Sequence, residues 1–162
     1  GTDHQALLAS FLNEDLQAYL GGEEIRFLET DSFLTYLRSS IANRGVSTAS
    51  IFAINAMLVA RSIVDGLTNC NPEDLIPLLA RLARGMLGSS GMVFRVGPGL
   101  LVCIHLAPHP VDPELIGWQV ERSLRRVFGI PARIQDILKG TVSYHPSATA
   151  SENAVRHFLS KL

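Results

Sequence analysis

Two apolar runs separated by a tight turn constrain the fold of this chain more than any other feature of its sequence. The runs lie between Met92 and Leu106, and the turn between them reads Gly97-Pro98-Gly99. Glycine and proline suit the backbone of tight turns, and apolar runs on both sides are typical of paired strands. The pattern therefore predicts a β-hairpin over Met92–Leu106.

The rest of the sequence predicts helices on both sides of this hairpin and strands beyond it. Helical spacing of apolar residues, with Asn71 and Asp112 as N-caps, predicts helices over residues 4–20, 31–44, 72–87, 113–128 and 151–162, and a helical turn over 61–67. Apolar runs predict strands over Ser50–Leu58, Ala132–Leu138 and Gly140–Tyr144. The order contains β-α-β-β-α-β, so we expect an α+β fold with a mainly antiparallel, ferredoxin-like sheet of about five strands, flanked by helices and preceded by an N-terminal helix. We expect the hairpin at the centre of this sheet.

The composition indicates a globular domain and argues against several classes of protein. The chain has 162 residues, 47% of them hydrophobic, which fits one domain with a sizeable core. The formal net charge of −1 gives no basic field for nucleic acid. The two cysteines, Cys70 and Cys103, argue against a disulfide framework and favour a reduced, cytoplasmic setting, with Cys103 as a core residue. No apolar stretch has the length of a membrane span, and no signal peptide is visible. The chain does not begin with Met, so we expect a piece of a longer protein.

The hairpin turn also resembles a motif of known enzymes. It carries Arg95 and Gly97, followed by Gly99 and Leu100. In the GGDEF domain, the catalytic domain of diguanylate cyclases, the same turn reads R-x-G-G-D-E-F, with metal-binding acids at its tip. Here the Arg and the first Gly match, while Gly99 and Leu100 stand where the family has its acids.

Weaker matches in the same order extend this resemblance from Glu29 to Leu162. Pro72-Glu73 is similar to the G-D before the family's long helix, and Gly140–Tyr144 is similar to its T-V-S-I-G strand. The resemblance implies a nucleotide-cyclase-like core in a GGDEF-like domain over 29–162, with an N-terminal amphipathic helix and connector over 1–28.

The resemblance also implies a nucleotide-binding cleft, in which the family's metal-binding acids are replaced in this chain. Joining two nucleoside triphosphates requires Mg²⁺ held by carboxylates, and the family takes these from its first strand and its hairpin tip. Ala56, with Asn55 beside it, and Gly99-Leu100 occupy those places, so we expect no catalytic residue, no metal and no cofactor. Val64 replaces the Asn that reads guanine, and Gly88-Ser89-Ser90-Gly91 lacks the charges of the inhibitory product site. The vestigial cleft comprises Asn55, Ala56, Val64, Asp65, Glu73, Gly97, Pro98, Gly99, Leu100 and Lys161.

The sequence leaves three interpretations open. The leading hypothesis is a catalytically inactive GGDEF-like module for signalling or protein contacts, within a larger bacterial signalling protein. The alternatives are a nucleotide-binding sensor or enzyme that uses the same cleft with altered chemistry, and an unrelated α+β domain. The expected partners are other signalling domains or proteins. We expect no nucleic-acid partner and no membrane span in this chain.

The first helix carries an apolar stripe of its own, formed by Leu8, Leu12, Leu16 and Tyr19. A stripe that folds back on its own domain is core, whereas an uncovered stripe favours a weak homodimer or docking onto an upstream module.

Overall fold

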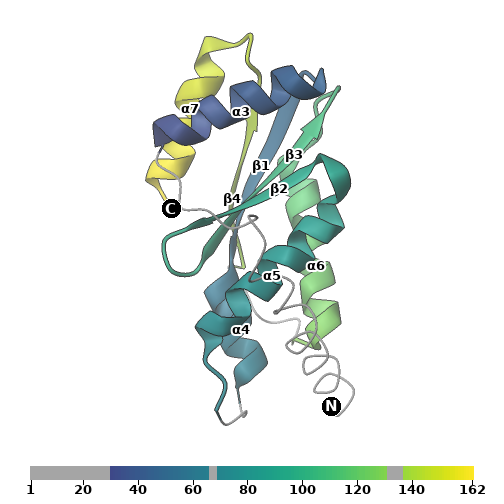
Figure 1. The fold of residues 1–162 in the computed structure, drawn as a ribbon, viewed down its shortest axis with the longest axis vertical. Helices are drawn as coiled ribbons and strands as arrows, with labels where there is room; N and C mark the ends of the chain where they lie inside the picture. The colour runs from purple at the N-terminus through teal and green to yellow at the C-terminus, as the bar shows by residue number, and fades with distance from the viewer. Residues whose placement is uncertain (1–29, 66–68, 131–136) are drawn as a thin grey trace.

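The structure is a computed structural model that describes residues 30–65, 69–130 and 137–162 of the chain. In chain order the elements are α3 (Thr30–Arg44), β1 (Thr48–Asn55), α4 (Ala56–Val64), α5 (Pro72–Leu87), the short turn η2 (Gly88–Ser90), β2 (Gly91–Val96), β3 (Leu100–Ala107), α6 (Pro113–Phe128), β4 (Leu138–Tyr144) and α7 (Thr149–Ser160). Figure 1 shows α4 at one end of the molecule, with α3 and α7 toward the other end. The predicted N-terminal helix over 4–20 and its stripe lie outside the described residues.

The described strands form one four-stranded antiparallel sheet in the order β2-β3-β1-β4. Helices connect β1 to β2 and β3 to β4, so the β-α-β-β-α-β order and the α+β, ferredoxin-like class are confirmed. The predicted hairpin is present, but it does not lie wholly at the centre of the sheet. β3 pairs with β1, whereas β2 is at an edge of the described sheet.

The number of strands also differs from the prediction. Within the described residues there are four strands instead of about five. The predicted strand Ala132–Leu138 lies outside those residues except for its last two positions. Leu138 already pairs with Ile54 of β1, so it belongs to the same strand as the predicted Gly140–Tyr144.

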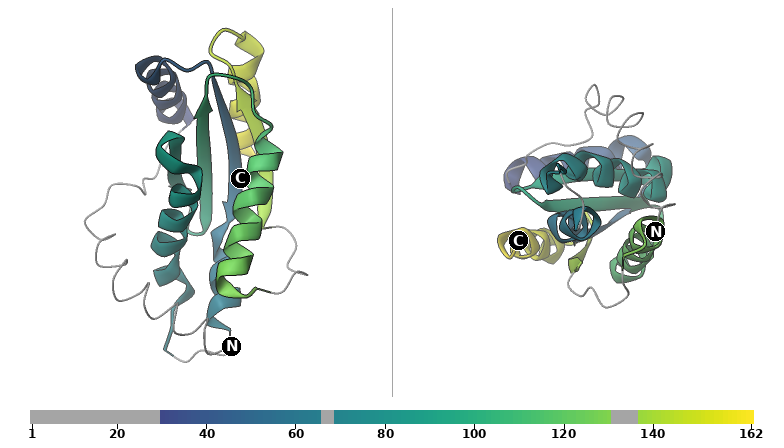
Figure 2. Two further views of the ribbon diagram at one scale, coloured as in Figure 1. Left: turned by 90° about the vertical axis from the view of Figure 1, so that its right-hand side faces the viewer. Right: turned by 90° about the horizontal axis from the view of Figure 1, so that it is seen from below.

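Helices cover both faces of this sheet (Figure 2), and each face has its own apolar core. Successive residues of a strand point to opposite faces. Along β1, Phe52 and Ile54 join a cluster with residues of α4, α5 and α6, while Ile51 and Ala53 join a second cluster with residues of α3 and α7. β1 therefore lies between two cores, and its burial is almost complete along its length.

Local capping signals explain why the long helices begin at the predicted residues. The Asn71 side-chain oxygen accepts a hydrogen bond from the Glu73 N–H at 3.1 Å, and Asp112 accepts from the Glu114 N–H at 3.0 Å. Both caps precede a proline at the first helical position, where its missing N–H costs nothing. None of the helices in the described ranges combines the length and the apolar character that a membrane crossing requires.

The prediction is wrong at the end of the first strand. The apolar run predicts a strand that extends to Leu58 and a helical turn at 61–67, but β1 ends at Asn55 and α4 begins at Ala56. The Asn55 side chain accepts a hydrogen bond from the Leu58 N–H at 3.0 Å, which caps the helix. A short apolar run does not by itself distinguish a buried strand from a buried helix.

The two cysteines differ sharply in their environment, and this difference can be tested. Both are free thiols; Cys103 is fully buried in the core, as predicted, and Cys70 is partly exposed. Burial raises the pKa of the Cys103 thiol, because the thiolate would lose its hydration. We expect one equivalent of a thiol reagent such as DTNB to react quickly with the folded chain, and the second only after unfolding. Cys70→Ser should abolish the fast phase; a fast phase that persists would show that Cys103 is accessible.

Candidate functional site

The predicted cleft residues begin where β1 leaves the sheet. Asn55 is opposite Leu100 in the register between β1 and β3, so the two residues are neighbours at the same end of the sheet. The Asn55 side-chain oxygen is engaged by the Leu58 N–H, and its backbone N–H donates to the Ile137 carbonyl at 2.7 Å. The Asn55 side chain is therefore the N-cap of α4.

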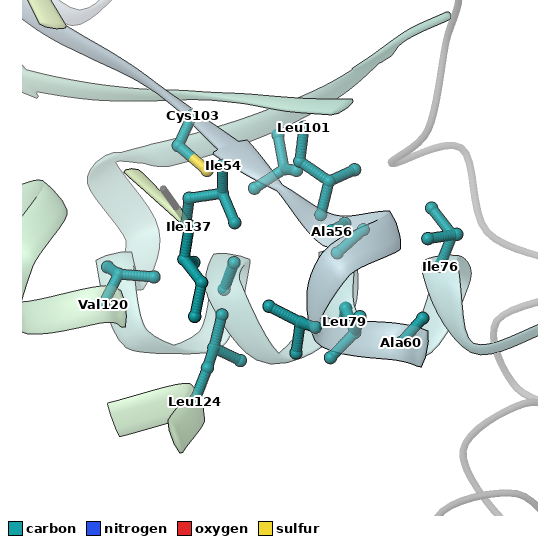
Figure 3. Packing of buried hydrophobic residues seen from close by; sticks show 14 of the residues in the cluster. Ile54, Ala56, Ala60, Ile76, Leu79, Leu101, Cys103, Val120, Leu124 and Ile137 are labelled. Atoms are coloured by element: carbon teal, nitrogen blue, oxygen red, sulfur yellow. The ribbon is translucent and has the colours of Figure 1, made fainter. Parts of the chain in front are cut away.

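Ala56 lies inside the apolar core. It is the first residue of α4 and is fully buried in the cluster that α4, α5 and α6 form with the sheet. Figure 3 shows Ala56 among the side chains of Leu101, Leu79 and Ala60. A carboxylate at this position would enter apolar surroundings, where an unpaired charge is strongly disfavoured.

The hairpin tip packs directly against the first turn of α4. The Met57 N–H donates a hydrogen bond to the Gly99 carbonyl at 3.0 Å. A Cβ added to Gly99 would lie 2.5 Å from the Met57 Cβ, so only glycine permits this approach. Gly97 and Pro98 are exposed, and Gly97 has a φ of 63°, in the left-handed region that favours glycine. The Arg95 side chain donates to the Pro98 carbonyl at 3.2 Å and fixes the turn from within the hairpin.

Two of the remaining predicted cleft residues lie at the end of α4 that is farther from this tip. Val64 and Asp65 lie at the other end of α4, which is about 13 Å long. Val64 packs against the core, whereas Asp65 is exposed. Glu73 is exposed in the first turn of α5, where its carboxylate suits the positive end of the helix. The length of α4 thus separates Val64 and Asp65 from the hairpin tip.

Lys161 and Leu100 do meet, in a pocket that the sequence pattern did not predict. The β4–α7 pocket has a volume of about 380 Å³. Its lining residues are Leu100, Lys139, Gly140, Thr141, Val142, Ala154, His157, Phe158, Lys161 and Leu162. The α7 members share one helix face, since 154, 157, 158 and 161 follow helical spacing, and this signal is visible in the sequence. Their meeting with β4 and Leu100 depends on the fold.

Ion pairs join α7 to α3 beside this pocket. Arg156 contacts Asp31 at 2.9 Å, and Arg38 contacts Glu152 at 3.2 Å. The hydrogen bond to Asp31 is the main cause that raises the pKa of Arg156. Because residue 31 meets 156 and residue 38 meets 152, the two helices run antiparallel, and the first turn of α3 lies beside the later turns of α7.

A second pocket, of about 500 Å³, lies between α5, β3 and α6 and contains His105. The His105 Nδ1 atom is buried and has no hydrogen-bond partner among the described residues. Within residues 30–65, 69–130 and 137–162, no three His, Cys, Asp or Glu side chains come close enough to hold a metal ion. Neither pocket therefore offers a carboxylate cluster for phosphoryl-transfer chemistry in the described part of the chain.

Comparison with known proteins gives one likeness among solved structures. No protein-family model matches the chain, and no curated protein sequence matches it significantly. The chain is similar to an N-terminally truncated mutant of TpbB, also called YfiN, from Pseudomonas aeruginosa, which comprises only the GGDEF domain. The likeness covers 83% of this chain and 84% of that chain, at 16% sequence identity and a TM-score of 0.43. It assigns no role to any residue of this chain.

Proposed function

We propose that this chain is a catalytically inactive GGDEF-like module that acts in the cytoplasm through contacts with other signalling domains or proteins. The proposal joins the motif resemblance of the hairpin to the geometry of the residues that stand in the family's catalytic places. It concerns a module within a larger signalling protein, and its output is a change in protein contacts.

The burial of Ala56 is the observation that carries this proposal. The resemblance places the first metal-binding acid of the family at this position, and here the position is a fully buried alanine in an apolar cluster. Phosphoryl transfer depends on metal ions and charged groups that neutralise the phosphates. A cleft without carboxylates at its metal position lacks the largest electrostatic contribution to this reaction.

The hairpin tip supports the same conclusion by its packing. Gly99 stands at an acidic position of the motif, and its carbonyl is hydrogen-bonded to the Met57 N–H at 3.0 Å. The turn is therefore tied to α4 and presents no carboxylate beside Ala56. Leu100 stands at the second acidic position and lines the β4–α7 pocket with an apolar side chain.

The test is product formation by the chain itself. We expect no cyclic di-GMP above a no-protein control after incubation with GTP and Mg²⁺ or Mn²⁺, measured by liquid chromatography. An active diguanylate cyclase in the same buffer serves as the positive control. Product that appears with this chain and disappears in the Asn55→Ala variant would contradict the proposal and favour an enzyme that uses the cleft with altered chemistry.

A further inference from the structure

The β4–α7 pocket combines an apolar floor with a cationic rim. Lys139, His157 and Lys161 are exposed at its edge, and none of the described residues that line it is acidic. Gly140 leaves the Phe158 ring open to the pocket, since a Cβ at 140 would lie 3.4 Å from the ring edge. An occupant that suits this site carries an apolar side chain next to negative charge.

The chain enters the described structure close to this pocket. α3 begins at Thr30, and Asp31 in its first turn is paired with Arg156 of α7. One helical turn after Arg156, α7 reaches its end and the pocket residue Lys161. Figure 1 shows the first turn of α3 near the C-terminal end of the chain. The first turn of α3 therefore lies beside the last turns of α7.

The sequence immediately before Thr30 has the composition that the pocket requires. It reads Glu23-Glu24-Ile25-Arg26-Phe27-Leu28-Glu29, with three acids and three large apolar residues. The whole of residues 1–29 contains six acidic residues against a single Arg and no Lys, in a chain whose formal net charge is only −1. The described remainder of the chain is thus cationic relative to its first 29 residues.

We propose that residues 23–29 dock into the β4–α7 pocket of the same chain, with Phe27 or Ile25 on the Phe158 floor and the glutamates facing Lys139 and Lys161. Seven residues reach up to roughly 23 Å when extended, which suffices to pass the end of α7. Attachment at Thr30 also gives the segment an effective concentration on the order of millimolar at the pocket. A partner's segment has no such advantage.

This docking would couple the region upstream of the domain to the hairpin. Leu100 is both a lining residue of the pocket and the first residue of β3, so an occupant contacts the base of the hairpin turn. Entry or release of the segment thereby changes the surface that the domain offers at this end. The inference is independent of catalysis, because product formation tests the proposed function and pocket occupancy tests the docking.

Disulfide trapping in the 162-residue chain tests the docking directly. In a Cys70→Ser background, Phe27→Cys is combined with Val142→Cys in the pocket. The matched control combines Phe27→Cys with Arg122→Cys, which is exposed on α6 on the other face of the sheet. We expect the pocket pair to form a disulfide within one chain at least about tenfold faster than the control pair under mild oxidation. Equal rates overturn the proposal, and so does a disulfide between two chains, which would assign the pocket to a second copy.

Charge reversal tests the recognition itself. Lys139→Glu with Lys161→Glu should slow trapping by about tenfold, because two attractive pairs become repulsive. Adding Glu23→Lys and Glu24→Lys should restore the rate, which a merely structural role of the lysines would not do. Circular dichroism confirms folding of each variant, and Lys139→Gln with Lys161→Gln is the milder substitute for a reversed protein that does not fold. A rate of disulfide formation that is the same in all these charge variants would overturn the proposal.

Discussion

Phe52→Ala is expected to lower the free energy of unfolding by about 3–5 kcal/mol, as deletion of a buried phenylalanine side chain does in other cores. Phe52 is fully buried on β1, between Cys103 of β3 and Thr141 of β4. Gly117 of α6 approaches the ring closely, since a Cβ at 117 would lie 3.4 Å from the Phe52 Cγ. Glycine has no side chain to move into the space left by the ring, so a cavity remains. This loss is a large share of the total stability of about 5–15 kcal/mol that is typical of a domain.

Urea unfolding followed by circular dichroism measures this effect. The transition midpoint should fall while its slope stays unchanged, which identifies a loss of native stability. Trp118→Ala is the matched control, because it removes a large aromatic side chain that is 48% exposed on the same helix as Gly117. This change should cost about 1 kcal/mol or less. If the two variants lose the same stability, Phe52 does not form part of the core as described.

The parts of the fold that the sequence predicted well depend on local signals. Asn71 and Asp112 cap their helices with side-chain hydrogen bonds to residues two positions later. The Gly97-Pro98-Gly99 turn joins two strands that pair with each other along their length. In each case the contacts that determine the helix start or the turn join residues close together in the sequence, so the local sequence pattern is enough to predict it.

The errors occur where a contact between distant residues decides the structure. The apolar run after Ser50 leaves the sheet at Asn55, and the helix that follows is buried by α5 and β3. β2 is at an edge of the described sheet because β1 pairs with β3 and β4, a choice that no local signal records. The predicted strand Ala132–Leu138 lies outside the described residues except for its last two positions.

In the candidate site, too, the sequence predicted what a local motif indicates and missed what depends on contacts between distant residues. The motif resemblance placed Asn55, Gly99 and Leu100 in one cleft, and the register of the sheet brings Asn55 and Leu100 together. The β4–α7 pocket was missed, although Lys161 was among the predicted residues. Lys139 and Lys161 are far apart in the sequence and meet only because β4 and α7 pack on each other.

Returning the family's acid to the hairpin tip is expected to destabilise the domain without giving it activity. In Gly99→Asp the new Cβ would lie 2.5 Å from the Met57 Cβ and 3.5 Å from the Met57 Cα. The tip must move away from α4, which strains the Met57–Gly99 hydrogen bond and should cost about 1–3 kcal/mol, as overpacking does. Adding Leu100→Glu should still give no cyclic di-GMP, because Ala56 and Val64 remain unable to bind metal or guanine.

Two further variants separate the steric effect from the charge. Gly99→Ala adds the Cβ alone and should retain most of the destabilisation. Gly85→Ala is the control, since nothing lies within 4 Å of its added Cβ and the residue is exposed on α5. There the better helix propensity of alanine should raise stability by up to about 1 kcal/mol.

A double-mutant cycle with Met57 identifies the contact that excludes an acid at position 99. Met57→Gly removes the side-chain atom closest to the added Cβ, at a cost of about 1 kcal/mol in helix propensity. If the clash is the cause, Met57→Gly with Gly99→Ala should be more stable than the two single effects predict, by about 0.5–3 kcal/mol. Additive effects would show that Gly99 is required for another reason. A coupled result would mean that recovering the motif requires rebuilding the first turn of α4 as well as the hairpin, because the packing that replaced the acids now occupies their space.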